Sequence, residues 1–317
     1  MAEGEGGGGG MSDAVFIVLI IIFLMVSWFL SGAAKNADVK GIFLSPPPPL
    51  GVGETIGLPG VADPYDTGNR EETAAITDEI GVVKRELQNV SGMPVSSYAG
   101  KIEIVSQWNG PQSSPVDEYV LIRAKQSNTE RITISDWSLM SAVNKRTAYI
   151  KEGAEVYEPS GSSDTGPIIL SPGDEAVIAT KRSPIGISFR LNTCSGYLDQ
   201  FQDYVPQLPH HCAYPDTEVR TSATSVMNDN ACISFLETMN VCRMETSPPP
   251  NLSEQCRSFI TSRLTYQGCV GAHRADAGFK EREWRIYLGY SEELWRDKRE
   301  VIVLLDSSGK VVDSFSY

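Results

Sequence analysis

The sequence predicts a mainly β protein: an antiparallel β sandwich with an α-helical, disulfide-rich insertion, preceded by an N-terminal transmembrane helix. Three observations predict this architecture. An uncharged apolar run lies near the N-terminus, apolar and polar side chains alternate from residue 101 onward, and all six cysteines fall between residues 191 and 298. Together they divide the chain into an anchor, a spacer, a sheet-forming region and a helical region.

The composition excludes two broad classes of protein. The chain has 317 residues, with 27 Lys and Arg against 40 Asp and Glu, and a formal net charge of −13. This acidic surplus argues against nucleic acid as a partner, because binding phosphates requires a surplus of Lys and Arg. Hydrophobic residues make up 41% of the chain, enough to form a core, which excludes a wholly disordered protein.

The most specific signal is the apolar run Ala14–Leu30, which contains no charged residue. As a helix it would rise about 26 Å, close to the roughly 30 Å of a bilayer core, so we expect a transmembrane helix over residues 14–34. A cleaved signal peptide is the alternative, since Ser31 and Ala33 suit a cleavage site. Residues 1–13 form a flexible tail without Lys or Arg, whereas signal peptides begin with basic residues, so an uncleaved single-pass anchor is favoured.

Two signals disagree about the side of the membrane on which the rest of the chain lies. Lys35 and Lys40 follow the apolar run, and the positive-inside rule would place them in the cytoplasm. Cysteines clustered in even number are typical of disulfides, which form outside the cytoplasm. Two lysines are the weaker signal. We therefore expect the carboxyl-terminal domain to be extracytoplasmic, with a protein or glycan of the cell envelope as its partner.

Between the anchor and the sheet region, the sequence predicts a spacer in two parts. Residues 35–69 are rich in Pro and Gly, with four prolines at 46–49, and predict an extended linker. Residues 70–90 predict an amphipathic stalk helix whose apolar stripe consists of Ile76, Ile80, Val83 and Leu87. This helix could stand alone, form an oligomer through the stripe, or pack on the domain that follows.

Short strands with period-two alternation predict the sandwich over residues 101–190 and 299–317. The expected strands are Lys101–Ser106, Tyr119–Lys125, Ile132–Ile134, Thr147–Ile150 and Ala176–Ala179, with a closing hairpin formed by Val301–Leu305 and Lys310–Asp313. An isolated hairpin is marginally stable in water, so we expect the closing hairpin to pair with strands of the 101–180 region. Residues 191–298 are then a helical, cysteine-rich insertion into the sandwich.

The insertion is predicted to contain three disulfides, formed by Cys194, Cys212, Cys232, Cys242, Cys256 and Cys269. Cys232 and Cys242 fall on one face of an expected helix, and three prolines at 248–250 end it. Asn251 and Glu254 resemble a capping box that opens a second helix, which carries Cys256 and ends at Gly268.

Six cysteines allow 15 pairings, and the expected helices favour one of them. Two antiparallel helices with a short turn between them would favour the nested bonds Cys242–Cys256 and Cys232–Cys269, which leaves Cys194–Cys212. A zinc site is disfavoured, because the sequence has no CxxC and the triplet His210-His211-Cys212 has no matching second half.

Three segments of the sheet region resemble lamin-tail domains. Ile134–Leu139 (ISDWSL) resembles their GWxL-type strand, with Asp136 in place of the usual Gly. Leu170–Ile178 (LSPGDEAVI) resembles their L-x-P-G segment, and Val301–Tyr317 resembles their closing hairpin. With its anchor and insertion, the chain is similar to membrane-anchored bacterial proteins that carry such a domain. The resemblance implies an immunoglobulin-like fold and a structural or binding role, with no shared catalytic residues.

A search for catalytic motifs yields no site. GxSxG, HExxH and GxxxxGK[ST] are all absent from the sequence. Asp297 and Glu300 follow Trp284 and Trp295, as paired carboxylates do in an aromatic sugar cleft, but charged surface beside core aromatics is the simpler interpretation. We therefore expect no enzyme, and neither a cofactor nor a metal.

The favoured function is that of a cell-surface structural or adhesion protein. Aromatic side chains of the insertion are its candidate contact surface, with core packing as the competing interpretation. They are Tyr197, Phe201, Tyr204, Trp284, Tyr287, Tyr290 and Trp295. An exported envelope hydrolase with a site between insertion and sandwich is the alternative, and convergent Asp, Glu or His in a cleft would favour it. A third possibility is a subunit of a larger envelope assembly, bound through the stripe of residues 76–87.

Overall fold

The structure is a computed structural model that describes residues 70–105, 114–159, 161, 163–221 and 225–317. Residues Asp66–Tyr317 form one compact unit. The expected tail, transmembrane helix and linker (residues 1–13, 14–34 and 35–69) lie outside the described residues. None of the helices in the described ranges combines the length and the apolar composition that crossing a bilayer requires.

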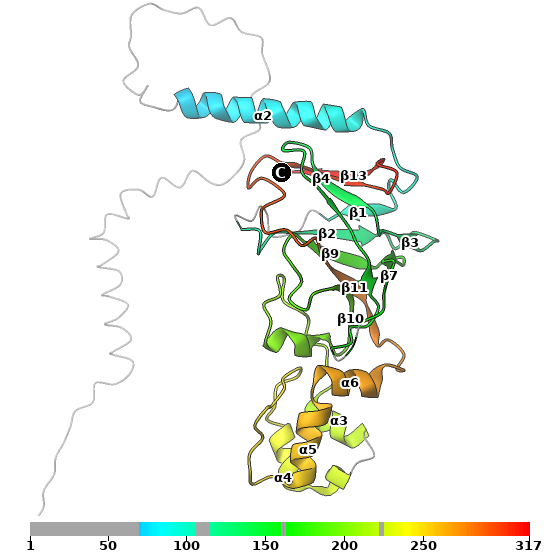
Figure 1. Ribbon diagram of the computed structural model, residues 1–317, viewed down its shortest axis with the longest axis vertical. Coiled ribbons are helices and arrows are strands. Elements are labelled where there is room, and N and C mark those ends of the chain that lie inside the picture. The colour runs from blue at the N-terminus through cyan, green and yellow to red at the C-terminus, as the bar shows by residue number, and fades with distance from the viewer. Residues whose placement is uncertain (1–69, 106–113, 160, 162, 222–224) are drawn as a thin grey trace, which may run out of the picture. The chain divides into compact units, whose positions relative to one another are not determined.

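The described chain is rich in β structure, with thirteen strands in three sheets (Figure 1). The seven-stranded sheet has the order β1 (Ile102–Ile104), β2 (Tyr119–Ala124), β9 (Glu175–Ala179), β11 (Lys280–Tyr287), β10 (Ser188–Asn192), β6 (Gly153–Ala154) and β7 (Thr165–Gly166). The four-stranded sheet has the order β13 (Val311–Ser316), β12 (Val301–Leu305), β4 (Ser138–Ser141) and β5 (Thr147–Tyr149). The third sheet pairs β3 (Ile132–Thr133) with β8 (Ile169–Leu170).

The two larger sheets contribute side chains to one hydrophobic core. Ile122 and Phe189 come from the first sheet, Leu139 and Ile302 from the second, and none is more than 1% exposed. Most strand pairs are antiparallel, as expected, but β9–β11 and β6–β10 are parallel, which the prediction of an antiparallel sandwich did not include. Parallel neighbours need a long crossover, and the helical segment between β10 and β11 gives β11 the length of chain to enter beside β9 in parallel.

The closing hairpin pairs with the earlier strands, as predicted. β12 lies between β13 and β4. At the turn, one carboxylate oxygen of Asp306 accepts the N–H groups of Ser308 and Lys310, and Gly309 adopts a φ of 74°, which favours glycine. The Asp313 carboxylate accepts the N–H of Ile104 at 2.7 Å and so ties β13 to β1.

Helix α2 (Arg70–Ser91) packs on the side of β12 that faces away from the shared core. Val83 and Val90 contact Val301 and Val303 in a separate apolar cluster. Because the intervening Ile302 faces the shared core, β12 is buried on both sides, which explains its unbroken apolar sequence. The predicted stripe is therefore divided: Val83 packs on the sheet, whereas Ile76, Ile80 and Leu87 are 37%, 55% and 38% exposed.

Strand β11 corrects the predicted boundary of the insertion. Residues 191–298 were expected to be outside the sandwich, but β11 lies between β9 and β10 in the seven-stranded sheet. Trp284 and Ile286 are fully buried there. The strand begins with four charged residues, KERE, and only its second half is buried. Alternation of apolar and polar side chains therefore does not identify it as a strand. The segment that leaves the sheets is residues 193–279, called the helical region from here on.

The helical region contains four α-helices and two short 3₁₀ turns in its described part. They are η2 (Ser195–Gln200), α3 (Pro215–Thr221), η3 (Ser225–Asn228), α4 (Asn230–Leu236), α5 (Glu254–Arg263) and α6 (Tyr266–His273). Figure 1 shows α3, α4, α5 and α6 gathered beyond one end of the seven-stranded sheet. A small core, which includes Leu236 and Ile260, stabilises α3, α4 and α5, whereas Tyr266 and Val270 of α6 pack in a separate cluster with Tyr197 of η2.

All six cysteines form disulfides, but the predicted pairing is wrong. The bonds are Cys194–Cys269, Cys212–Cys242 and Cys232–Cys256, instead of Cys194–Cys212, Cys232–Cys269 and Cys242–Cys256.

Helix capping explains the difference. α4 ends at Leu236, so Cys242 lies beyond the helix with a φ of 58° and does not share a helical face with Cys232. The cap of α5 is Ser253, not Asn251, and its hydroxyl donates at 2.6 Å to Asp229, the cap of α4. This bond places the two helix N-termini side by side. Cys232 and Cys256, three residues after each cap, therefore meet.

Candidate functional site

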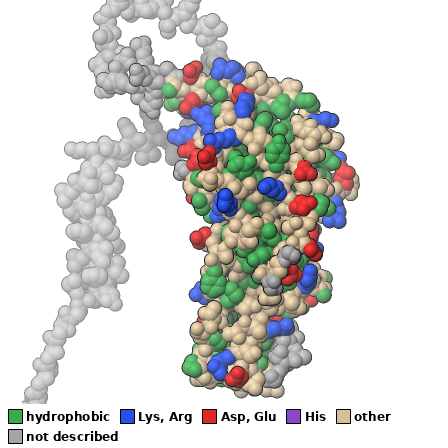
Figure 2. All heavy atoms as spheres, viewed as in Figure 1, with side chains coloured by type: hydrophobic (Ala, Val, Ile, Leu, Met, Phe, Trp, Pro, Cys, Tyr) green, Lys and Arg blue, Asp and Glu red, His purple; other side chains and the backbone are tan. Residues whose placement is uncertain are grey.

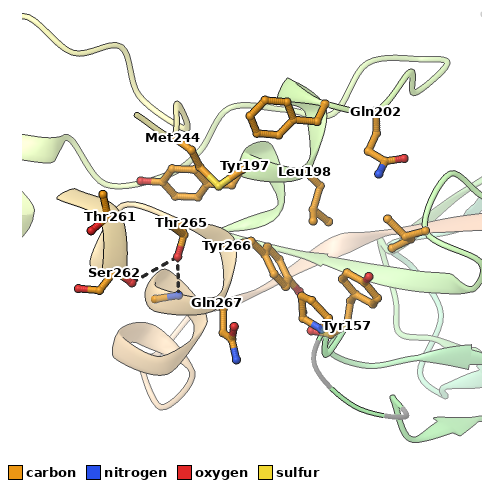
Figure 3. A pocket seen from close by; sticks show the side chains of 14 residues that line it. Tyr157, Tyr197, Leu198, Gln202, Met244, Thr261, Ser262, Thr265, Tyr266 and Gln267 are labelled. Atoms are coloured by element: carbon orange, nitrogen blue, oxygen red, sulfur yellow. Dashed lines mark hydrogen bonds between the residues drawn. The ribbon is translucent and has the colours of Figure 1, made fainter. Parts of the chain in front are cut away.

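A cavity of about 640 Å³ opens between the helical region and loops of the sheet region, and we call it the aromatic groove. One wall is formed by η2 and the residues after it, including Tyr197, Leu198 and Gln202 (Figure 3). The α5–α6 junction, residues 261–268, forms the other wall, and Tyr157 of the sheet region lies beside it. Its volume is within the range of about 300–1,000 Å³ that is typical of ligand sites.

One disulfide joins the two walls of the groove. Cys194 immediately precedes η2, and Cys269 lies in α6. The hydroxyl of Tyr266, at the start of α6, donates to the carbonyl oxygen of Tyr157 at 3.1 Å and accepts from the amide of Asn192 at 3.3 Å. The helical wall is therefore bonded both to η2 and to the sheet region.

The α5–α6 junction depends on a close backbone approach. Thr265 caps α6: its hydroxyl accepts a hydrogen bond from the N–H of Gly268 at 3.0 Å and donates its O–H to the carbonyl oxygen of Ser262 (Figure 3). A Cβ at Gly268 would lie 2.0 Å from that carbonyl oxygen, so only glycine fits. The expectation that one helix runs from Asn251 to Gly268 is therefore wrong: α5 ends at Arg263, and Gly268 lies inside α6.

The described lining of the groove contains no charged side chain. Its described lining consists of aromatic, aliphatic, methionine, hydroxyl and amide side chains. Burial raises the pKa of Tyr197 to about 12 and that of Tyr266 to about 12, so both phenols are neutral hydrogen-bonding groups at physiological pH. Elsewhere the surface is mixed, and Figure 2 shows Lys and Arg side chains interspersed with Asp and Glu. The groove therefore suits the binding of an uncharged ligand better than proton transfer.

The aromatic side chains expected to form a contact surface are mostly core residues. Tyr197, Tyr204, Trp284, Tyr287 and Trp295 are between 0% and 9% exposed, whereas Phe201 is 61% and Tyr290 39% exposed. Of these seven, only Tyr197 and Phe201 line the groove. Sequence reasoning missed Tyr157, Tyr266 and Met244. The only signal for Met244 and Tyr266 is that they lie close in sequence to the disulfide-bonded Cys242 and Cys269, and no such signal marks Tyr157.

The pair Asp297 and Glu300 does not form a sugar cleft with Trp284 and Trp295. Glu300 is fully buried, and its carboxylate accepts hydrogen bonds from the Ser141 hydroxyl and from the N–H groups of Arg296 and Val301. Both tryptophans are at most 3% exposed. Glu300 therefore stabilises the loop before β12.

A second cavity, of about 630 Å³, brings an acid and an imidazole together. Asp199 and His210 lie 3.3 Å apart there, beside Arg243 and Tyr214. The lining includes Cys242, but its sulfur is in a disulfide, and Asp199 is the one carboxylate. The described lining therefore has neither an Oγ or thiolate nucleophile nor a second carboxylate for hydrolysis.

All three histidines of the chain lie in the helical region, and each pairs with carboxylates. His210 contacts Asp199, and His211 contacts Glu281 at 2.9 Å. His273 contacts both Glu218 of α3, at 2.8 Å, and Asp276, at 2.7 Å. Within the described ranges no group of three or more His, Cys, Asp or Glu side chains could hold a metal ion. The His210 and His273 pairs therefore link segments of the helical region, and the His211 pair links that region to β11.

His273 predicts a pH-dependent link between α3 and α6. Burial lowers its pKa, but hydrogen bonds to Asp276 and Glu218 outweigh burial and hold the pKa above its usual 6.5. A raised pKa in the folded state stabilises the protein below about pH 6.5, and this stabilisation disappears as the pH rises through the folded pKa. The difference in melting temperature between the protein and its His273→Gln variant should shrink between pH 6 and 9. A constant difference would contradict the prediction.

Comparison of the sequence with models of known protein families and with curated proteins finds no match.

Proposed function

We propose that this protein is a single-pass, membrane-anchored cell-surface protein that binds another component of the cell envelope through the aromatic groove. The observation that carries the proposal is the uncharged lining of the groove, whose walls are joined by Cys194–Cys269. The apolar run Ala14–Leu30 supports the anchor. The bonding of all six cysteines supports an extracytoplasmic location, because disulfides persist in oxidising compartments.

For the sheet region we propose a lamin-tail-like, immunoglobulin-like sandwich. The core shared by the two larger sheets supports a sandwich. Asp136, at the position where the resemblance has glycine, adopts a φ of 66°, and Gly173 in the LSPGDE segment adopts a φ of 81°. Glycine takes this left-handed conformation at least cost, and Asp tolerates it better than most residues. Both turns therefore have the backbone that a lamin-tail pattern would require.

The alternative of an envelope hydrolase has less support. Its best candidate is the contact between Asp199 and His210, which lies within the helical region and not between that region and the sheets. A dyad of this kind can orient an imidazole as a general base. The nucleophile or second carboxylate that hydrolysis requires is missing from the described lining, so binding is the function that the geometry favours.

Site-specific crosslinking in intact source cells tests the proposed function. p-Benzoylphenylalanine placed at Phe201, in the groove, should form an adduct with an envelope component on irradiation. Tyr149 on β5 is the matched control, because its side chain is also 61% exposed but lies outside the groove. Adducts at position 201 alone would support the proposal. Adducts at both positions, or at neither, would overturn it.

A further inference from the structure

We infer that the ligand of the aromatic groove is an extended, uncharged, proline-rich peptide segment of a partner protein. This inference rests on the proposed function and specifies its ligand. It depends on three properties of the groove: its lack of charge, the kind of apolar surface that it offers, and the rigidity of its walls.

Charge complementarity selects an uncharged ligand. The chain carries a formal net charge of −13, yet the described lining of the groove contains no charged side chain. A charged group that entered the groove would lose its hydration without gaining an ion pair, which is unfavourable. An anionic ligand would also be repelled by the net charge of the protein.

The apolar surface favours a peptide over a glycan. Sugar rings bind best against the flat faces of aromatic rings, but Tyr197 and Tyr266 are only 2% and 4% exposed and offer little face. Phe201 is the exposed aromatic ring of the lining, at 61%. Much of the rest is aliphatic or thioether surface from Leu198 and Met244, and methionine adapts to side chains of different shape.

An extended proline-rich backbone fits the remaining features. Polyproline segments have no internal hydrogen bonds, so their carbonyl oxygens stay available as acceptors. Gln202 is exposed on the η2 wall and extends toward the cavity, where its amide can donate (Figure 3). Prolines are already restricted before binding, and the exposed ring of Phe201 offers them the aromatic contact that proline-binding grooves use. Because Cys194–Cys269 also restrains the walls, both partners would lose little conformational entropy.

Fluorescence anisotropy with defined probes tests the inference on the full-length protein in detergent micelles. The probes are fluorescein-labelled decaproline, a labelled Gly-Ser decapeptide and labelled cellohexaose. We expect decaproline to bind and the Gly-Ser peptide not to bind. Phe201→Ala should weaken decaproline binding about 10-fold or more, as the loss of an aromatic anchor does. Tyr149→Ala, the matched exposed control, should leave it unchanged.

The outcomes separate this inference from the proposed function. Binding of cellohexaose but not decaproline, sensitive to Phe201→Ala, would overturn the peptide and leave a binding groove in place. Failure of all three probes, with adducts still formed at position 201 in cells, would also overturn the inference alone. Failure of the probes without adducts would overturn both. Equal loss of binding in Phe201→Ala and Tyr149→Ala would assign the signal to nonspecific contacts and contradict the inference, and melting curves of both variants control for unfolding.

Discussion

Deletion of Val301–Tyr317 should unfold the whole sheet region, even though all six cysteines remain. The deletion removes β12 and β13, and β12 is an interior strand of the four-stranded sheet. Its five side chains are at most 7% exposed, and each contributes about 1.5–3 kcal/mol when fully buried. Together they match the entire net stability of a domain, about 5–15 kcal/mol. β4 would also lose one of its two neighbouring strands, and α2 would lose the β12 side chains on which it packs.

Circular dichroism and thermal melting of the truncated chain measure this effect. We expect loss of the cooperative sheet transition, while helical signal from the disulfide-linked α4 and α5 persists. Ser307→Ala, in the exposed turn of the same hairpin, is the control and should melt at the temperature of the unchanged protein. A truncated protein that melts cooperatively at the full-length temperature would show that residues 301–317 are not part of the same cooperative unit.

The sequence predicts best the strands that are buried along their whole length, because their side chains are then uniformly apolar. The expected strand Val301–Leu305 matches β12, because five β-branched or leucine residues before an Asp-Ser-Ser-Gly turn have few alternatives. β11 is different. Its first half carries the exposed side chains of Lys280 and Arg282, and its second half carries the buried side chains of Trp284 and Ile286. Its partner strands β9 and β10 lie about a hundred residues earlier in the sequence. Such a strand is specified by its tertiary neighbours, which local periodicity cannot reveal.

The cysteines show the same limit in another form. Their number and clustering predict three disulfides, and three are present. Their pairing depends on where each helix begins, and one residue decides it: Ser253, rather than Asn251, caps α5 and bonds to Asp229. Two polar residues of similar capping tendency, only two positions apart, cannot be distinguished as the cap by sequence alone.

The groove could be predicted only in part. Phe201 and Tyr197 were among the aromatic candidates, but Tyr157 and Met244 reach the same cavity from segments far apart in the sequence. Most of the other candidates, such as Trp284 and Tyr204, became core residues, because a large aromatic ring in a folded chain is more often buried than presented. Whether a ring is buried depends on the elements that pack over it, and the composition of the chain does not predict this packing.

Removal of Cys194–Cys269 should weaken binding in the groove about 10-fold or more, whereas removal of Cys232–Cys256 should leave it unchanged. Alanine is the better replacement, because Cys194, Cys232 and Cys256 are fully buried and a serine hydroxyl would lack a partner. The bonds span 75 and 24 residues, so losing them should cost roughly 4.5 and 3.5 kcal/mol in the chain-entropy description. The two double variants are therefore matched in stability within about 1 kcal/mol. They differ in location, since only Cys194–Cys269 joins η2 to α6 across the groove.

The affinity for decaproline and the yield of crosslinks at position 201 measure this difference. Chemical unfolding of each double variant gives its free energy of unfolding for comparison. We expect Cys194→Ala/Cys269→Ala to lose at least about 10-fold in affinity, because ordering two separated walls must then accompany binding. Cys232→Ala/Cys256→Ala should keep the affinity of the unchanged protein, since its sulfurs pack in the separate core around Leu236 and Ile260. Equal losses in both variants would assign the effect to general destabilisation. Full affinity in the first variant would mean that the bond from Tyr266 to Tyr157 is sufficient to hold the wall in place.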